Sequence, residues 1–160
     1  RLLPVRPTGI LKETMMMKSI RSFAAAIAFA MCLPMAAHAS SEKSLYEQLG
    51  GKESIRMVMD DFVVRLKADP RIGDQFAATN ADRLASQLTD QVCEATGGPC
   101  KYVGADMKTA HEGMVITKAH FNALVEVLQT SMNAYSVPFD VQLEVLSMLA
   151  PMHRDVITVR

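Results

Sequence analysis

The chain has 160 residues, which is enough for one domain. Its 17 basic and 17 acidic residues balance, and residues 40–160 alone carry 12 basic and 16 acidic residues, a net charge of −4. This mild acidity leaves no basic patch for binding nucleic acid.

The first 39 residues are predicted to lie outside the fold. Residues 1–14 precede the first methionine and resemble upstream translated sequence or a cloning remnant. Residues 15–39 have the parts of a secretory signal peptide: basic residues, an apolar run over 23–33, and Ala37-His38-Ala39 before the cleavage point. The apolar run is too short to span a bilayer as a helix. We therefore expect export, to the periplasm, without stable membrane insertion after cleavage.

Residues 44–157 are predicted to form one all-helical domain, because they contain no β alternation and no internal repeat. Ser44 and Glu47 have the spacing of a capping box at the start of a short helix. The next helix has a wide apolar stripe that ends before Asp69-Pro70. Its members are Ile55, Val58, Met59, Phe62, Val63 and Leu66.

A third helix is expected to begin after Thr79-Asn80, which offers N-caps, and to end at Gly97-Gly98-Pro99. Its predicted apolar face is made of Leu84, Leu88, Val92 and Ala95. Thr117 is predicted to cap a fourth, long helix. The apolar side of that helix carries Phe121, Leu124, Val125, Leu128 and Met132.

The last predicted helix carries Val145, Leu149, Met152 and Val156. Pro151 lies inside this pattern and is expected to kink the helix or loosen one turn. In contrast, the stretch from Cys93 to Thr117 is weak in helical periodicity. In so small a domain that gap favours a bound cofactor, which would fill the middle of the fold and stabilise it.

Two cysteines, Cys93 and Cys100, follow the predicted cleavage point. In an oxidising compartment they can pair and clamp the turn between them. The sequence leaves pairing and two unpaired thiols equally open, because it does not give the separation of the two Cα atoms.

The histidines are the candidate metal ligands. His120 and His153 have no ligand spacing to a second candidate, so a structural or solvated role is expected for both. The sequence after the predicted leader contains no zinc or di-iron motif, phosphate loop or nucleophile elbow. His111 differs, because Met107 lies one turn before it, on the same face if this turn is helical. Ala110 and Gly113 are small and would let a planar group approach closely.

Val115 and Ile116 add an apolar wall beside His111. An imidazole on an apolar floor is the setting of a proximal haem ligand. A buried histidine of an ordinary core fits these residues equally well.

From Ser44 to about Val156 the chain resembles the truncated haemoglobins of the first group, the two-over-two globins. The resemblance is carried, in the family's order and spacing, by Leu45–Gly51, Ala68–Ile72, Phe76, Thr79-Asn80, Gly97–Pro99, Tyr102–Gly104, Met107-Lys108, Ala110–Ile116, His120-Phe121, Val137-Pro138 and Ala150-Pro151. It implies an all-α two-over-two sandwich around haem b, with His111 as the proximal ligand of the iron.

The same resemblance implies roles for further residues around the cofactor. Phe76 packs on the haem, and Tyr102 and Met107 line the proximal side. Phe62 borders the pocket from the second helix, while Leu84 and Leu88 form the distal face of the third. With Val63 and the wall residues, the expected cofactor-binding set is His111, Phe62, Val63, Phe76, Leu84, Leu88, Tyr102, Met107, Val115 and Ile116.

The distal side departs from the family pattern. Many members carry a tyrosine that donates a hydrogen bond to bound oxygen, and here that position is Val63. The family's usual glutamines align with Leu84 and Leu88, and Gln87 and Gln91 are expected to face elsewhere. A missing donor costs roughly 1–3 kcal/mol, so we expect weaker or faster-dissociating oxygen binding.

Three functions follow as hypotheses. The first is an exported haem protein that reversibly binds a diatomic gas: O2, NO or CO. The second is a haem-based redox enzyme, a nitric oxide dioxygenase or a peroxidase-like protein, with a redox partner that the sequence does not identify. It ranks lower, because such reactions favour polar distal groups. The third is a helical module without a cofactor that binds a protein partner.

Overall fold

The structure is a computed structural model that describes residues 43–159. The predicted leader and signal peptide, residues 1–14 and 15–39, therefore lie outside the described residues. All regular elements among residues 43–159 are helical, as the sequence predicts. No helix in this part of the chain is long and apolar enough to cross a membrane.

The described part of the chain begins with a short helix and a long one, α1 (Leu45–Gln48) and α2 (Gly51–Ala68). Ser44 caps α1 as predicted: its hydroxyl accepts the Glu47 N–H at 3.3 Å, and the Glu47 carboxylate accepts the Ser44 N–H at 2.8 Å. Gly50 joins the two helices in the left-handed region, with φ +83°. The sharp turn between α1 and α2 thus requires a residue without a Cβ atom.

A 3-10 helix, η1 (Gly73–Phe76), leads from α2 into α3 (Ala81–Ala95). The Asn80 side chain caps α3 by accepting the Arg83 N–H at 2.8 Å, which confirms the predicted start. A long connection then leads to α4 (Met107–Ala110), a single helical turn.

The C-terminal half holds α5 (Lys118–Ala134) and α6 (Phe139–Leu149). Thr117 caps α5, as the sequence predicts. After α6 the chain continues as a 3-10 turn, η2 (Ala150–Met152), and as α7 (His153–Val156). The loosened turn at Pro151 is the predicted effect of a proline inside a helical pattern, since its ring removes one N–H donor.

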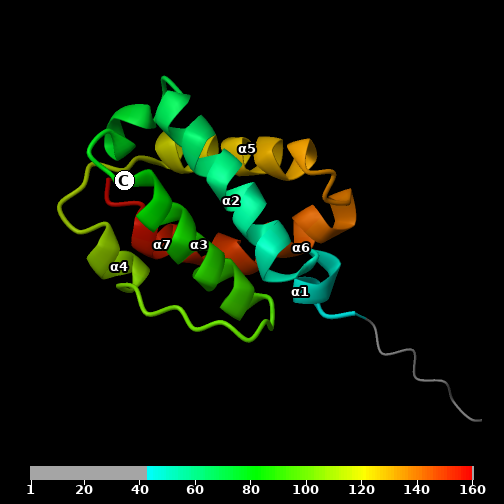
Figure 1. Cartoon of the computed structure of the whole chain (residues 1–160). Helices are drawn as coiled ribbons and strands as arrows, with labels where there is room; N and C mark the ends of the chain where they lie inside the picture. Colours follow the sequence, from blue (N-terminus) through cyan, green and yellow to red (C-terminus); the bar gives the residue numbers. More distant parts are fainter. Residues whose placement is uncertain (1–42, 160) are drawn as a thin grey trace, which may run out of the picture. The chain divides into compact units, whose positions relative to one another are not determined.

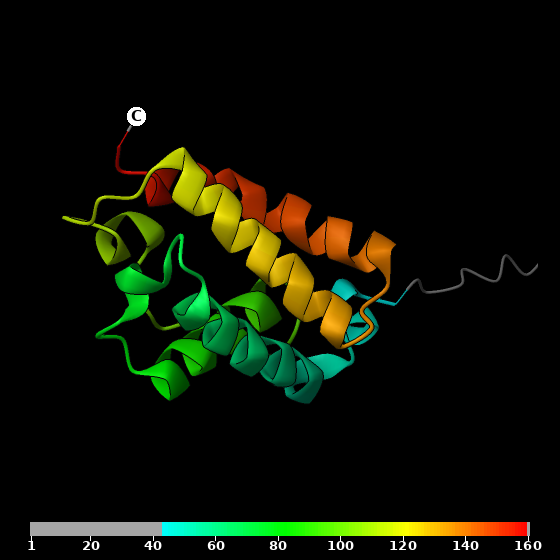
Figure 2. The same cartoon turned by 90° about the horizontal axis from the view of Figure 1, so that it is seen from above.

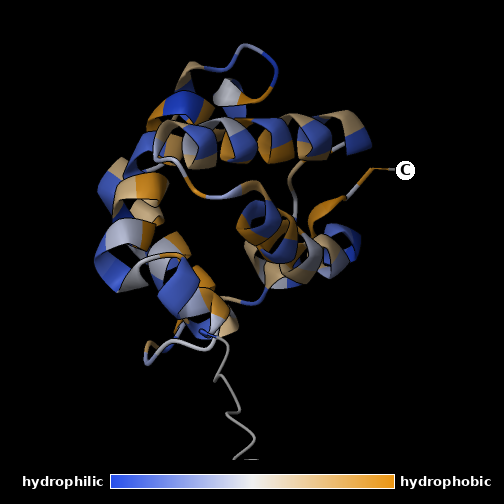
Figure 3. Cartoon of the chain, turned by 90° about the vertical axis from the view of Figure 1, so that its right-hand side faces the viewer, coloured by the Kyte–Doolittle hydropathy of each residue, from blue (hydrophilic) through white to orange (hydrophobic). Residues whose placement is uncertain are grey.

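The helices form two crossed layers. α2 packs against α3 and against α5, and α5 packs against α6. Figure 1 shows α2 in front of α5, and Figure 2 shows α5 and α6 together on one side, with α2 and α3 on the other. Each helix carries hydrophilic and hydrophobic stripes, which Figure 3 shows as blue and orange bands. The short helix α4 lies beside α7, at a distance from the α1–α6 contact.

The core is centred on α2, whose six predicted stripe residues are all buried. On α3 the buried face lies about one residue from the predicted apolar face, and Val92 belongs to both. The buried residues there are Ala85, Thr89, Val92 and Cys93, whereas Leu84 and Leu88 are half-buried and Ala95 is exposed. Small side chains occupy the face toward α2 because they let the two helices approach closely.

The same shift occurs on the other helices. On α5 the buried residues are Ala123, Val127, Leu128, Ser131 and Met132, and the predicted Phe121, Leu124 and Val125 are only half-buried. In the last predicted helix Val145 and Val156 are buried, whereas Leu149 and Met152 are half-buried. Several large apolar side chains from α3, α5 and α6 therefore remain partly exposed at the edge of the core.

Candidate functional site

The candidate site is centred on His111, which ends α4. Asp106 starts this helix by accepting the Thr109 N–H at 2.9 Å. The Nδ1 atom of His111 lies 2.6 Å from the Met107 carbonyl oxygen. A carbonyl oxygen only accepts, so this contact places a proton on Nδ1, and in the neutral ring Nε2 is then the nitrogen that can bind a metal. A metal-binding histidine has this arrangement, because its second nitrogen is commonly held by a backbone carbonyl.

His111 lies on a segment that has almost no core of its own. We call residues 97–116 the His111 arm. Within it, no side chain from residue 101 to residue 115 is buried, and only Ile116 at its end is, with 7% exposure. Buried packing therefore contributes little to the position of His111, and the contacts at the two ends of the arm add to the packing of α4 beside α7.

The C-terminal end of the arm is held by the last residues of the chain. The Thr158 hydroxyl donates to the Met114 carbonyl at 2.5 Å and accepts the Ile116 N–H at 2.9 Å. The N–H groups of Thr158 and Val159 both donate to the Ile116 carbonyl at 3.0 Å. Gly113 precedes this attachment with φ +79°, which turns the chain after the histidine.

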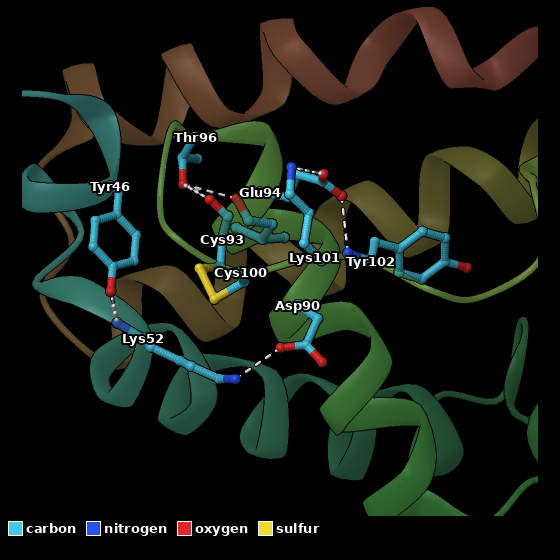
Figure 4. The surroundings of a disulfide bond; sticks show 10 residues. Tyr46, Lys52, Asp90, Cys93, Glu94, Thr96, Cys100, Lys101 and Tyr102 are labelled. Carbon is cyan, nitrogen blue, oxygen red and sulfur yellow. Dashed lines mark hydrogen bonds and ion pairs between the residues drawn. A yellow bond between two sulfur atoms is a disulfide. The ribbon is translucent and has the colours of Figure 1, made fainter.

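The N-terminal end of the arm is held by a disulfide between Cys93 and Cys100, a pairing that the sequence leaves open. Figure 4 shows this bond between α3 and the arm. Beside it, the Glu94 carboxylate accepts the Tyr102 N–H at 2.8 Å and the Lys101 ammonium at 3.0 Å. These contacts, with the Tyr102 N–H first, hold the pKa of the Glu94 carboxyl below its ordinary value.

The facing surface comes from α3. Gln91 projects toward α4, and its Nε2 atom lies 3.6 Å from the sulfur of Met107 and 3.6 Å from the sulfur of Met152. The expectation that Gln91 faces away is therefore wrong. Its spacing is the signal that would have found it, since Leu84, Leu88 and Gln91 stand at i, i+4 and i+7 and share one face of the helix.

The other predicted cofactor residues occupy different depths. Phe62 and Val63 lie inside the core, with 3% and 1% exposure. Phe76 is half-buried at the core edge. Of the two predicted wall residues, Val115 is 63% exposed and Ile116 is buried. Tyr102 is half-buried, donates its hydroxyl proton to the Ala105 carbonyl at 2.8 Å, and has a pKa raised by burial.

The two remaining histidines of the described residues have local partners. The His120 Nδ1 atom accepts the Thr117 N–H at 3.4 Å as part of the α5 capping box. His153 is exposed, and its Nδ1 atom lies 2.9 Å from the Ala150 carbonyl oxygen. Residues 43–159 contain no group of three or more His, Cys, Asp or Glu side chains that could hold a metal ion. A metal on His111 would therefore need other ligands.

A flat apolar cofactor that brings most of its own metal ligands would meet this need. The residues present fit haem, because a histidine with a free Nε2 atom lies among apolar side chains that remain half-buried. Those on α3 and α4 are Leu84, Leu88 and Met107. An apolar group against them would remove their exposed surface from water, which is favourable by about 25 cal/mol per Å².

Comparison with known proteins shows similarity to globins. Residues 44–158 match a family described as Bacterial-like globin. A group 1 truncated haemoglobin of Mycolicibacterium paratuberculosis is 35% identical over 115 residues, which cover 72% of this chain and 85% of that protein. A group 1 truncated haemoglobin of a Synechocystis species is 33% identical over 120 residues, which cover 71% of this chain and 97% of that protein.

Solved structures agree with the sequence matches. The crystal structure of truncated haemoglobin from Tetrahymena pyriformis in the Fe(III) form superposes with a TM-score of 0.69 at 30% identity, covering 72% of this chain and 98% of that one. The two-over-two haemoglobin of a Synechococcus species, solved in the cyanomet state with covalently attached haem, gives a TM-score of 0.68 at 28% identity, covering 73% of this chain and 100% of that one.

Proposed function

This chain belongs to the bacterial-like globin family as a haem-binding group 1 truncated haemoglobin, and from that premise we propose that it holds haem b on His111 and reversibly binds a diatomic gas. The observation that carries the proposal is that His111, with its Nδ1 atom 2.6 Å from the Met107 carbonyl oxygen, lies among half-buried apolar side chains, whereas His153 has a similar contact but is exposed. The contact orients the ring so that Nε2 is the nitrogen left for a metal.

The chain's own residues supply three things to this function. His111 provides one nitrogen ligand, and the half-buried apolar side chains exclude water from the two faces of the cofactor. When bound, haem would supply the iron that binds the gas, with His111 as the residue that holds it. Leu84 and Leu88 share the face of α3 that carries Gln91, and the Gln91 amide lies next to Met107 of α4.

The nature of the α3 face supports gas binding over redox catalysis. Enzymes that stabilise developing charge use several preorganised polar donors. Val63 is buried in the core, and the α3 face presents two leucines beside the single amide of Gln91. A largely apolar face favours ligands that bind iron with little help from hydrogen bonds. O2, CO and NO differ in how much their binding depends on such bonds.

We further propose that the protein works outside the reducing cytosol, in the periplasm. The signal-peptide pattern of residues 15–39 supports export, although it lies outside the described residues. The Cys93–Cys100 disulfide supports it independently, because structural disulfides persist in oxidising compartments. Mass spectrometry of protein isolated from its native cell tests this directly: a mature N-terminus near residue 40 agrees with export, and an intact residue 15–39 segment contradicts it.

The assignment of His111 is tested by absorption spectroscopy of haem-loaded protein. His111→Ala should lose the Soret band of the wild-type protein, or shift it to that of loosely held haem. His120→Ala is the matched control and should keep the wild-type spectrum, because His120 serves the α5 cap. An unchanged spectrum in His111→Ala would refute the assignment. In the ferrous protein without gas we expect five-coordinate iron, and a six-coordinate spectrum would contradict an apolar distal face.

A further inference from the structure

The segment that carries His111 is attached to the rest of the protein at two points, and the first of them is covalent. Cys93 lies on α3 with 0% exposure, two residues after Gln91, which faces the candidate site. Cys100 lies at the start of the connection to α4. The disulfide therefore joins the helix that forms one wall of the site to the arm that forms the other.

The surrounding contacts reinforce the same point of attachment. Gly98 lies so close to its neighbours that a Cβ atom there would come within 2.5 Å of the Tyr46 ring and 2.6 Å of the Cys93 sulfur. The Tyr46 N–H donates to the Thr96 carbonyl at 3.1 Å, which ties α1 to the end of α3. Glu94, the residue after Cys93, accepts the Tyr102 N–H. These contacts fix the chain over residues 93–102, which we call the disulfide corner, so the arm does not leave α3 as a free loop.

Beyond this corner the arm has little to hold it. Residues 101–115 have no buried side chain, and their ordering rests on local contacts such as the Asp106 cap and the Tyr102 hydroxyl on the Ala105 carbonyl. Local contacts fix the shape of a segment but not its place relative to other elements. Its place is set by the disulfide before it and the Thr158 contacts after it, together with the packing of α4 beside α7 and the approach of Gln91 to Met107.

We propose that the Cys93–Cys100 disulfide, with Glu94 beside it, is a positioning device for the haem ligand: it holds the His111 arm against α3 and thereby sets how slowly haem is lost. This inference rests on the proposed role of His111. It assigns Cys93, Cys100 and Glu94 to the function, although none of them is expected to contact the cofactor.

The test compares haem retention in the holoprotein of several variants. In the Cys93→Ala/Cys100→Ala double variant we expect transfer of haem to excess apomyoglobin to be about ten times faster than in the wild-type protein. We also expect the iron–histidine stretching band of the ferrous gas-free form, measured by resonance Raman, to shift or broaden. Glu94→Ala should act in the same direction and more weakly, whereas Lys101→Met, which removes only an exposed ion pair, should have no effect.

A destabilised control separates positioning from general stability. Val145 lies in α6 with 2% exposure. Val145→Ala should lower the melting temperature without changing the iron–histidine band. If the double cysteine variant does not fold, Glu94→Ala and Lys101→Met carry the comparison alone. Alkylation followed by mass spectrometry of the unfolded wild-type protein should find both cysteines blocked by the disulfide.

The possible outcomes are distinct. Faster haem loss together with a changed iron–histidine band, absent from Val145→Ala, supports the inference. A normal Soret band with an unchanged transfer rate and band in both the double cysteine variant and Glu94→Ala overturns it and leaves the proposed function intact. Two free thiols in the purified wild-type protein overturn it as well. A wild-type protein that takes up no haem would refute the proposed function and this inference together.

Discussion

The two walls of the haem site are stabilised in opposite ways. α2 and α3 are long helices that bury an apolar face against each other, and every stripe residue of α2 is inaccessible to water. The His111 arm contains a single helical turn and no buried side chain between residues 101 and 115. One wall is therefore stable by its own packing, while the other depends on a disulfide, a carboxylate and a threonine hydroxyl.

This difference separates two tasks that a small globin must perform. The packed wall supplies most of the buried apolar side chains of the fold. The tethered wall would present the iron ligand, and it is held by a few specific contacts in place of a core. Substitutions in the first wall should act on folding, and substitutions in the second should act on haem.

The largest effect is expected in the packed wall. Phe62→Ala should lower the free energy of unfolding of the apoprotein by about 3–5 kcal/mol, because a fully buried aromatic ring is replaced by a cavity. Denaturant unfolding of the apoprotein measures it. Val103→Ala in the arm, where the side chain is 92% exposed, is the control and should change this free energy by less than about 0.5 kcal/mol. Similar losses in the two variants would remove the contrast between the walls.

The next effect concerns the polar group on the α3 face. Gln91→Leu should speed O2 dissociation from the ferrous protein about tenfold, since a lost hydrogen bond to a ligand with partial negative charge costs roughly 1–2 kcal/mol. CO dissociation should change little. Gln87→Leu is the matched control on the same helix. Equal O2 rates in Gln91→Leu and wild type would show that the amide serves only its two methionine neighbours.

A smaller effect is expected at the C-terminal attachment of the arm. Thr158→Val keeps the shape of the side chain and removes both contacts of its hydroxyl, to the Met114 carbonyl and the Ile116 N–H. The loss of about 1 kcal/mol should appear as haem transfer a few times faster than in wild type. Thr130→Val, whose hydroxyl bonds only within α5, should transfer haem at the wild-type rate. The comparison fails if both threonine variants behave alike.

The smallest effect is a pH dependence carried by Glu94. The Tyr102 N–H and the Lys101 ammonium favour the ionised carboxyl, so its pKa is lower in the folded protein than the ordinary value of 4.5. The folded state then binds fewer protons than the unfolded state. Its contribution is complete above that ordinary pKa and is lost as the pH falls through the lower, folded value. Haem transfer measured from neutral pH down to acid should therefore accelerate below about pH 4.5.

Glu94→Gln is the variant that isolates this group. The amide oxygen still accepts the Tyr102 N–H, so haem transfer near neutral pH should stay close to the wild-type rate. The acceleration in acid should become weaker, because the residue no longer takes up a proton. Superimposable pH profiles for the two proteins would show that Glu94 does not contribute to the acid sensitivity of the arm.

The sequence predicts the helix ends well and their packed faces less well. Ser44, Asn80 and Thr117 cap helices where predicted, because capping depends on side chains within three residues of the helix start. The apolar face predicted for α3 differs in part from its buried face, because the hydrophobicity pattern selects Leu84 and Leu88. The structure instead buries Ala85 and Thr89 against α2. Which face of a helix meets its neighbour depends on the whole fold.

The features of the site also differ in whether the sequence predicts them. His111 and Met107 are found from the sequence because they are one turn apart and interact locally. The disulfide and the approach of Gln91 to Met152 depend on elements far apart in the chain, and no spacing rule supplies those distances. The Cα atoms of the two cysteines are 5.7 Å apart, a separation suited to pairing that only the structure provides.

The central claim, that the arm exists to present His111 to haem iron, is tested most directly by chemical rescue. In His111→Gly the ferrous gas-free protein should lose the wild-type five-coordinate spectrum and its iron–histidine stretching band. Added imidazole should restore a five-coordinate spectrum by occupying the space of the missing ring. A His111→Gly protein that keeps the wild-type spectrum without imidazole would contradict the account.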